Sequence, residues 1–230
     1  ANATFGIVPM AVQFTDTSAY LPTSWKWDFG DGSTSTLQNP SHTYPAAGLY
    51  TTTLEATNAQ GSNTTSRKNY IRVFAHEPGA IAGWGGNNGH GEASPPAGSD
   101  YIAVDGGRKH SIALRANGSL VGWGDNEFGE STVPPGSDYI AIAAGRYHNY
   151  ALRSNGSIVG WGDGSYNCLV DIPAGTDFTA ISAGDAWGAA LMSDGTIVQW
   201  GDYNFGLYPP PAGTGYSDLG GVYTQGLALS

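Results

Sequence analysis

The sequence predicts an all-β protein in which a β-sandwich is followed by a β-propeller domain of four repeats. Short segments throughout the chain alternate apolar and polar residues with a period of two, which indicates strands rather than helices. Glycine makes up 35 of the 230 residues, and turn-forming clusters separate the alternating segments. After residue 80, a Trp-Gly pattern recurs at intervals of 38 or 39 residues, which indicates a repeat architecture.

Composition and charge exclude several classes of protein. Hydrophobic residues make up 40% and aromatic residues 12% of the chain, enough to build a core, so a disordered tail is excluded. No run approaches 18 uncharged apolar residues, so no membrane span is expected. The formal net charge of −10 lies wholly in residues 76–230. Such a surface repels phosphate, so nucleic acid is not an expected partner.

Residues 1–75 form the predicted sandwich. Alternating segments and turn clusters follow one another there, with alternation at 10–15, 50–57 and 70–74 and turn clusters at 30–33 and 58–61. Trp27 and Phe29 fall on one face of a strand and are expected in the core, whereas Asp28 falls on the other face. Asp28 and Asp31 are expected to form turns rather than to bind metal, because Asp beside Gly commonly supports a tight turn.

A resemblance to a known domain family rests on three motifs: Trp25-Lys-Trp-Asp-Phe-Gly-Asp-Gly, Asn39-Pro-Ser-His-Thr-Tyr and Ala47-Gly-Leu-Tyr-Thr. Together they resemble the polycystic kidney disease (PKD) domain over about residues 1–74. The resemblance implies a small immunoglobulin-like sandwich of the kind found on extracellular and cell-surface proteins. Residues 76–80, His-Glu-Pro-Gly-Ala, are expected to form a short linker, because the Pro-Gly pair breaks any strand.

Residues 81–230 contain the four repeats, which align on Trp84, Trp123, Trp161 and Trp200. An Asn-Gly or Asp-Gly pair precedes three of these tryptophans, and such a pair between two apolar runs is a strong signal for a β-hairpin. Each repeat is therefore predicted to supply three short antiparallel strands and a proline-rich loop. About 40 residues of this kind are typical of one propeller blade.

The repeats resemble two kinds of propeller protein. The pattern A-x-x-x-G-x-x-H-x-x-A-L-x-x-N-G-x-L-V-x-W-G resembles the regulator of chromosome condensation repeat. The short blade, with Val-Pro-Pro or Ile-Pro-Ala before the next strand, resembles the secreted β-lactamase inhibitor protein type II. The resemblance implies a β-propeller, and the inhibitor family implies that a loop between the first two strands of each blade supplies aromatic contacts to a target enzyme.

Closure of the propeller has two alternatives. The repeats begin with Ala80–Trp84, which aligns with the last strand of a blade, and they end with Gly226–Leu229, which aligns with the strand before it. These two segments can pair within one chain and close a four-bladed disc, or they can pair between chains and join arcs into a dimer or filament. Unpaired, each would expose a row of backbone donors and acceptors.

The candidate binding residues lie in the loop between the first two strands of each blade. Arg, Tyr and Trp are the residue types that most often anchor protein interfaces. The candidates for a partner-binding face are Arg108, Lys109, His110, Arg146, Tyr147, His148, Trp187 and Tyr223. The alternative is that these side chains pack against the neighbouring blades. Four sequons are candidates for N-glycosylation, at Asn2, Asn63, Asn117 and Asn155.

The sequence contains no recognisable catalytic constellation. Gly-x-Ser-x-Gly and His-Glu-x-x-His patterns are absent, and only two repeats keep a histidine at the position of His110 and His148, so neither catalysis nor a metal site is expected. The lone cysteine, Cys168, cannot form a disulfide within the chain. Neither is a cofactor expected.

The expected function is that of a non-enzymatic extracellular or cell-surface structural protein. It would be a building block of a surface layer, matrix or filament, and its partners would be proteins, copies of itself included. The alternative is a secreted binding module, either a propeller-face enzyme inhibitor or a glycan-binding adhesin. A soluble monomer favours the binding module, whereas polymers favour the building block.

Overall fold

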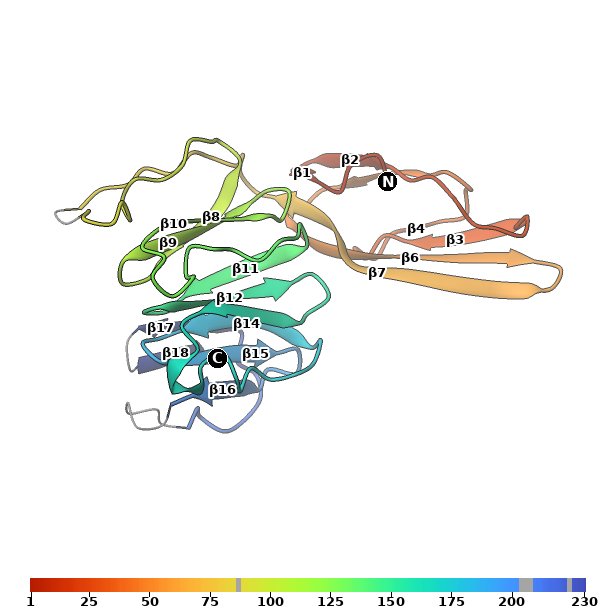
Figure 1. Ribbon diagram of the computed structural model, residues 1–230. Helices are drawn as coiled ribbons and strands as arrows, with labels where there is room; N and C mark the ends of the chain where they lie inside the picture. Colours follow the sequence, from red (N-terminus) through yellow and green to blue (C-terminus); the bar gives the residue numbers. More distant parts are fainter. Residues whose placement is uncertain (86–87, 203–208, 223–224) are drawn as a thin grey trace. The chain divides into compact units, whose positions relative to one another are not determined.

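The computed structural model describes residues 1–85, 88–202, 209–222 and 225–230 (Figure 1). The chain divides into two compact units, Ala1–Glu77 and Pro78–Ser230, so the division falls inside the segment expected to be a linker. Nearly every regular element is a strand, and the described residues contain one short 3₁₀ helix, η1 (Ser165–Asn167). The all-β prediction is therefore confirmed.

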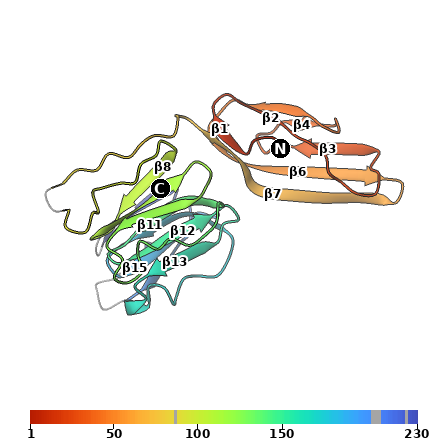
Figure 2. The same cartoon turned by 45° about the horizontal axis from the view of Figure 1, so that its top comes forward.

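The first unit is a sandwich of two sheets. Its seven strands are β1 (Phe5–Ile7), β2 (Met10–Gln13), β3 (Ser24–Asp28), β4 (Thr34–Ser35), β5 (Ser41–Tyr44), β6 (Gly48–Asn58) and β7 (Gly61–Phe74). The larger sheet has the order β1-β7-β6-β3-β4, and β2 pairs with β5 in the smaller one. Figure 2 shows β3, β6 and β7 side by side, with β2 over them.

The core of the sandwich forms as the alternation predicts. Trp27 and Phe29 are 6% and 2% exposed, and the hydroxyl of the buried Tyr44 donates to the Phe29 carbonyl at 3.1 Å. Asp28 points out of the core, and its carboxylate accepts the Gly30 N–H at 2.8 Å, which fixes the turn. Gly30 has a φ of +84°, and a Cβ there would overlap the backbone of Thr51, so no other residue fits this turn.

The second unit consists of consecutive blades. Three blades have three antiparallel strands each, and the last described blade has two. The strands are β8 (Tyr101–Gly106), β9 (His110–Arg115), β10 (Leu120–Gly124), β11 (Tyr139–Ala144), β12 (His148–Arg153), β13 (Ile158–Gly162), β14 (Phe178–Ala183), β15 (Trp187–Met192), β16 (Ile197–Gly201), β17 (Asp218–Val222) and β18 (Gln225–Leu229). The prediction of blades built from short hairpins is confirmed.

The complete blades repeat one another in detail. In each, the pairing of the first two strands shifts register after the first residue, at Tyr101, Tyr139 and Phe178. Each hairpin turn is held by an Asn or Asp side chain that accepts the backbone N–H two residues on, at 2.9 Å from Asn117, Asn155 and Asp194. The first strands β8, β11, β14 and β17 contact one another in chain order, so the blades form a row.

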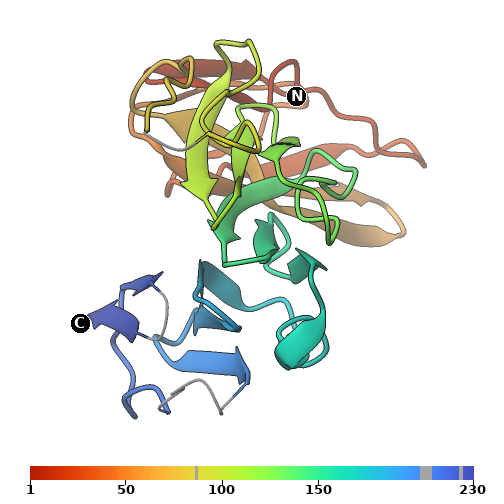
Figure 3. The ribbon, with the colours of Figure 1, turned by 60° about the vertical axis from the view of Figure 1, so that its left-hand side comes forward.

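The row of blades is open. Figure 3 shows the blades following one another from green to blue in a curved row, of which the dark blue β17 and β18 are the last strands. Residues 80–85 lie outside any strand, and β18 pairs with β17 alone among the described residues. The expectation that Ala80–Trp84 forms a strand is wrong for the single chain, because a strand needs a neighbour for its backbone groups and no described strand pairs with this segment.

Candidate functional site

The turns between the first two strands share one construction. In each, a glycine N–H donates to the carbonyl three residues on, and the three bonds run from Gly107 to His110 at 2.9 Å, from Gly145 to His148 at 2.8 Å and from Gly184 to Trp187 at 3.0 Å. The last residue of each turn begins the second strand of its blade. The two residues before it form the tip of the turn. Each turn therefore has one inward position, at the start of the strand, and two outward positions, at the tip.

The inward positions do not belong to a partner-binding face. His110, His148 and Trp187 are 1%, 2% and 3% exposed, so these three candidates are corrected to packing residues. The Nε2 atom of His110 lies 2.7 Å from Oδ1 of Asn149 in the next blade, and the Asn149 amide donates to the Glu130 carbonyl at 2.9 Å. The packing alternative is therefore the one that holds for these side chains.

His148 differs from His110 in the hydrogen bonding of its Nε2 atom. The position equivalent to Asn149 is Gly188 in the third blade, and the buried Nε2 of His148 has no hydrogen-bond partner within the part of the chain that the structure describes. Burial lowers the pKa of His148 to about 4, so this histidine is neutral at physiological pH.

A compact group, here termed the Arg–Tyr cluster, consists of four tip residues and one residue from the loop after β10: Arg108, Arg146, Tyr147, Asp185 and Phe128. The Arg108 guanidinium donates to the Tyr147 hydroxyl, and its central carbon lies 5.6 Å from the centre of the Tyr147 ring. Arg146 lies 5.2 Å from the same ring centre and pairs with Asp185 at 3.0 Å. Phe128 packs edge-on against Tyr147, with the ring centres 5.5 Å apart.

The Arg–Tyr cluster can bind an acidic or aromatic group. Arg146 is neutralised by Asp185, whereas Arg108 is exposed and pairs with a phenol rather than a carboxylate among the described residues. A guanidinium can stack on a ring and still offer N–H groups to a carboxylate, phosphate or sulfate. This is a cationic feature in a unit that carries a formal net charge of −9.

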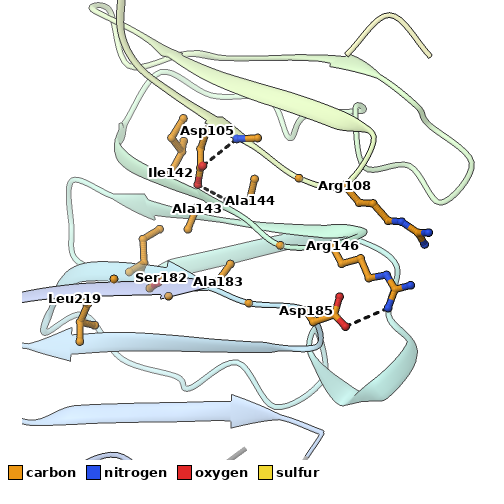
Figure 4. Close-up of a pocket in the computed structure, with 17 residues that line it drawn as sticks. Asp105, Arg108, Ile142, Ala143, Ala144, Arg146, Ser182, Ala183, Asp185 and Leu219 are labelled. Atoms are coloured by element: carbon orange, nitrogen blue, oxygen red, sulfur yellow. Dashed lines mark hydrogen bonds and ion pairs between the residues drawn. The ribbon is translucent and has the colours of Figure 1, made fainter. Parts of the chain in front are cut away.

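A hollow of about 610 Å³ lies beside the cluster and is lined by the ends of β8, β11, β14 and β17 (Figure 4). Asp105 lines it, and burial raises the pKa of this carboxyl. Both oxygens are already engaged, because one accepts the Gly106 N–H and the other the Ala144 N–H, each at 2.8 Å. The bond to Ala144 joins the first blade to the second, so Asp105 stabilises the row of blades.

The remaining candidates do not belong to the cluster. Lys109 pairs with Asp125 at 3.8 Å, and Tyr223 lies outside the described residues. The sequon asparagines Asn2, Asn63, Asn117 and Asn155 are all exposed. Within the described ranges, no three His, Cys, Asp or Glu side chains come together as metal ligands. No helix in those ranges is long and apolar enough to cross a bilayer.

A second candidate site consists of the two ends of the row, which sequence reasoning identified as segments but not as apolar surfaces. Trp161 and Trp200 are 9% and 3% exposed, and their indole N–H groups donate to the carbonyls of Glu130 and Cys168 at 3.0 and 3.1 Å. Trp84 aligns with them and is 87% exposed.

The other end of the row shows the same contrast. Leu227 and Leu229 of β18 are 71% and 63% exposed. At the equivalent positions of the complete blades the side chains are at most 7% exposed: Ile112 and Leu114, Tyr150 and Leu152, and Ala189 and Leu191. The signal was present in the sequence, because Leu227 and Leu229 align with the inward residues of every other blade.

Comparison with known proteins assigns both parts of the chain. Residues 3–73 match the PKD domain, and residues 101–130 and 139–168 match the regulator of chromosome condensation (RCC1) repeat. A microbial collagenase of Vibrio alginolyticus is 48% identical over 40 residues, which are 17% of this chain and 5% of the collagenase.

Two solved structures are similar to this chain. The PKD1 domain of Vibrio anguillarum Epp is 32% identical, with 28% of this chain and 94% of that domain aligned and a TM-score of 0.23. Yeast RCC1 (Prp20), solved with Kap60, is 15% identical, with 90% of this chain and 62% of that chain aligned and a TM-score of 0.48. This chain spans less than two thirds of the collagenase and of Prp20. The chain consists of an N-terminal PKD domain followed by RCC1 repeats.

Proposed function

We propose that this protein is a non-enzymatic extracellular building block that assembles through protein–protein contacts into a surface layer, matrix or filament. The observation that carries the proposal is the exposed segment at the start of the blade row. Trp84 in this segment is 87% exposed, whereas the equivalent Trp161 and Trp200 are 9% and 3% exposed. A segment with unpaired backbone groups and an exposed apolar side chain favours association with another chain.

The extracellular setting of the proposal rests on the similar proteins and on the sequons and cysteine of the chain. A PKD domain also occurs in the Vibrio protein Epp, and a 40-residue segment of this chain is 48% identical to a microbial collagenase. The chain has four exposed sequons and a single buried cysteine. The low content of charged side chains, 12%, suits a protein that packs against copies of itself better than one that stays dispersed.

The proposal is tested by the size of the purified protein. We expect light scattering to show particles much larger than the 23.8 kDa chain and electron microscopy to show extended assemblies. The variant W84K should remain monomeric, because a charge would replace the exposed tryptophan while leaving the buried core unchanged. A matched control, V170K, changes an exposed apolar residue in the loop that follows η1 and should assemble normally. A wild-type protein that stays monomeric at every concentration contradicts the proposal.

A second function is favoured by the Arg–Tyr cluster. The exposed Arg108 beside Tyr147 and Phe128 fits a secreted binding module that recognises an acidic glycan or an enzyme, in line with the resemblance of the short blades to β-lactamase inhibitor protein type II. Screening immobilised acidic polysaccharides and secreted hydrolases tests this function. Binding by the wild type that R108E abolishes supports it, and binding that R108E leaves intact contradicts it.

A further inference from the structure

We propose that the sandwich carries an N-linked glycan on Asn63 and that the first sugars of this glycan pack on the exposed ring of Tyr20. The inference goes beyond the assembly proposed above and shares with it only the extracellular setting. Asn63 begins a sequon in β7, and Tyr20 lies in the loop between β2 and β3. Both residues line a hollow of about 730 Å³ in the sandwich.

The hollow arises because the two sheets of the sandwich differ in length. The strands β6 and β7 have 11 and 14 residues, whereas β2 and β5 have four each. Figure 1 shows the β6–β7 hairpin running past the end of β2. The far end of the hairpin therefore has an inner face that the smaller sheet does not cover, and the loop at 18–22 borders this face.

Strand pairing places the sequon on this inner face. Thr65 lies opposite Leu54 and Asn63 lies opposite Ala56, and residues directly opposite each other in a sheet share a face. Leu54 packs against the core of the sandwich, so the shared face is the inward one. The acceptor asparagine and the threonine of its sequon therefore both face the hollow that they line.

Tyr20 and its neighbour Leu21 are exposed and held in a strained conformation. Their side chains are 89% and 88% exposed, and their φ angles of +62° and +50° lie in the left-handed region that residues other than glycine rarely adopt. The Asn58 amide donates to the Tyr20 carbonyl at 2.8 Å and so helps to hold the loop in this conformation. An aromatic ring that its loop holds in water is suited to a ligand that covers it.

The lining of the hollow suits a neutral carbohydrate. All of its residues are uncharged, and they combine the Tyr20 ring and the aliphatic Leu21 with the amides of Asn58 and Gln60. A sugar ring has a C–H face that packs on an aromatic ring, and its hydroxyl groups hydrogen-bond amides. A glycan attached at Asn63 is tethered beside this lining, which gives it a high effective concentration there.

The other three sequon asparagines have structural roles that account for them. Asn117 and Asn155 hold hairpin turns, and Asp194 makes the same bond in the third blade, so these turns do not require a glycan acceptor. The Asn2 side chain accepts a backbone N–H of β2 at 2.8 Å. The Asn63 side chain makes no such bond to the residues that the structure describes.

The modification joins Nδ2 of Asn63 to the anomeric carbon of the first sugar. The donor is a lipid-linked oligosaccharide diphosphate, whose bond between the anomeric carbon and the phosphate oxygen breaks. The lipid diphosphate leaves, and the amide loses one proton to balance the step. Asn63 is exposed, so its amide is accessible to this chemistry.

A double substitution in two hosts tests the inference. The wild type, N63Q, Y20A and N63Q/Y20A are secreted from a eukaryotic host that N-glycosylates and are also produced in a bacterial host that lacks this modification. In the glycosylated protein, N63Q should lower the melting temperature of the sandwich by about 4–8 °C, the shift that one ring contact gives in a domain of this size. In the Y20A background, and in protein from the bacterial host, N63Q should change the melting temperature little.

The matched control is L37A, which removes another exposed apolar side chain of the sandwich. In this background, N63Q should still lower the melting temperature of the glycosylated protein. Peptide mapping of the secreted wild type should find a glycan on Asn63, and an unmodified Asn63 overturns the inference.

Two further results would also overturn it. An N63Q effect of equal size with and without Tyr20 means that the glycan does not pack on the ring. Stabilisation of the bacterially produced protein by soluble dextran, if Y20A removes it, assigns the hollow to an external polysaccharide. All of these results leave the proposed assembly standing, because assembly is measured by particle size and fails separately.

Discussion

The middle blades and the ends of the row have the same sequence pattern but different surroundings. In the middle, Trp200 and Leu152 are 3% and 0% exposed and belong to one cluster that spans the second and third blades. At the ends, Trp84 and Leu229 occupy the equivalent positions and are 87% and 63% exposed. The contrast shows that the strand of a repeat residue sets the direction of its side chain, whereas the neighbouring blade buries that side chain.

Neighbour-dependent burial has an energetic consequence. Each blade is too small to cover its own apolar face, so adjacent blades stabilise one another. The outermost apolar surfaces have no neighbouring blade and therefore contribute no such stabilisation. The same substitution should therefore cost much in the middle of the row and little at its ends. Paired substitutions at equivalent positions can break this comparison or sharpen it.

The largest contrast is expected between two tryptophans. Trp200→Ala should lower the free energy of unfolding by about 3–5 kcal/mol, because it removes a buried ring and its hydrogen bond to Cys168. Trp84→Ala should change it by less than about 0.5 kcal/mol in the monomer. Calorimetry of the repeat unit measures both values. Equal losses would show that Trp84 is buried in the free chain.

A similar contrast is expected between two leucines on the second strands of their blades. Leu152→Ala should cost about 2–5 kcal/mol, since the side chain is fully buried. Leu229→Ala should leave the unfolding of the monomer nearly unchanged and should act on assembly instead. Denaturant unfolding of dilute protein checks the first effect, and light scattering of concentrated protein checks the second. A large loss of monomer stability from Leu229→Ala would contradict the open row.

The strands could be predicted from the sequence because local patterns determine them. Period-two alternation placed Trp27 and Phe29 in the core, and the Asn-Gly pair at Asn117 predicted a hairpin turn. Both features depend on residues close together in the chain. The recurring Trp-Gly spacing then predicted that the same hairpin would appear again and again.

The inward and outward loop positions were also available from this pattern but were not separated. His110 lies two and four residues before Ile112 and Leu114, so alternation along β9 puts all three on the buried face. Arg108 precedes the strand, and its contact with Tyr147 links positions 39 residues apart. Alternation cannot predict that contact, because it depends on how neighbouring blades stack.

Whether the first segment of the row pairs with the last strand could not be predicted from the sequence. Alignment shows that Ile81–Gly85 is equivalent to a third strand, but it does not show whether the row bends far enough for this segment to meet β18. Curvature depends on the small rotation between successive blades, which many side chains set together. The open row is therefore a property of the packing and not of a motif.

Acid should weaken the contribution of the buried His148 to stability. Burial lowers the pKa of His148 to about 4, below its usual 6.5, so the unfolded chain takes up a proton first as the pH falls. The contribution of neutral His148 is fully present above pH 6.5 and is lost as the pH falls toward 4, by about 3 kcal/mol.

The variant His148→Phe isolates this effect, because it keeps an aromatic ring at the position where the third blade has Trp187. Unfolding free energies of the wild type and the variant are measured from pH 7 to pH 4. The variant should lose less stability over this range than the wild type does. Parallel pH profiles for the two proteins would contradict the assignment.

The smallest change in stability is expected at a position where the second blade has an ion pair and the third blade has an apolar contact. Arg153 donates to both oxygens of Asp138 at 3.0 Å and lies 4.9 Å from the centre of the Tyr139 ring, and Met192 and Phe178 replace this arginine and this tyrosine in the third blade. Both residues of the ion pair are partly exposed, so Arg153→Met should cost only about 0.2–1 kcal/mol. The cost should shrink as salt screens the pair. Unfolding at low and high salt measures it. A loss of several kcal/mol would show that this rim of the blade, unlike the exposed ends of the row, depends on charge for its folding.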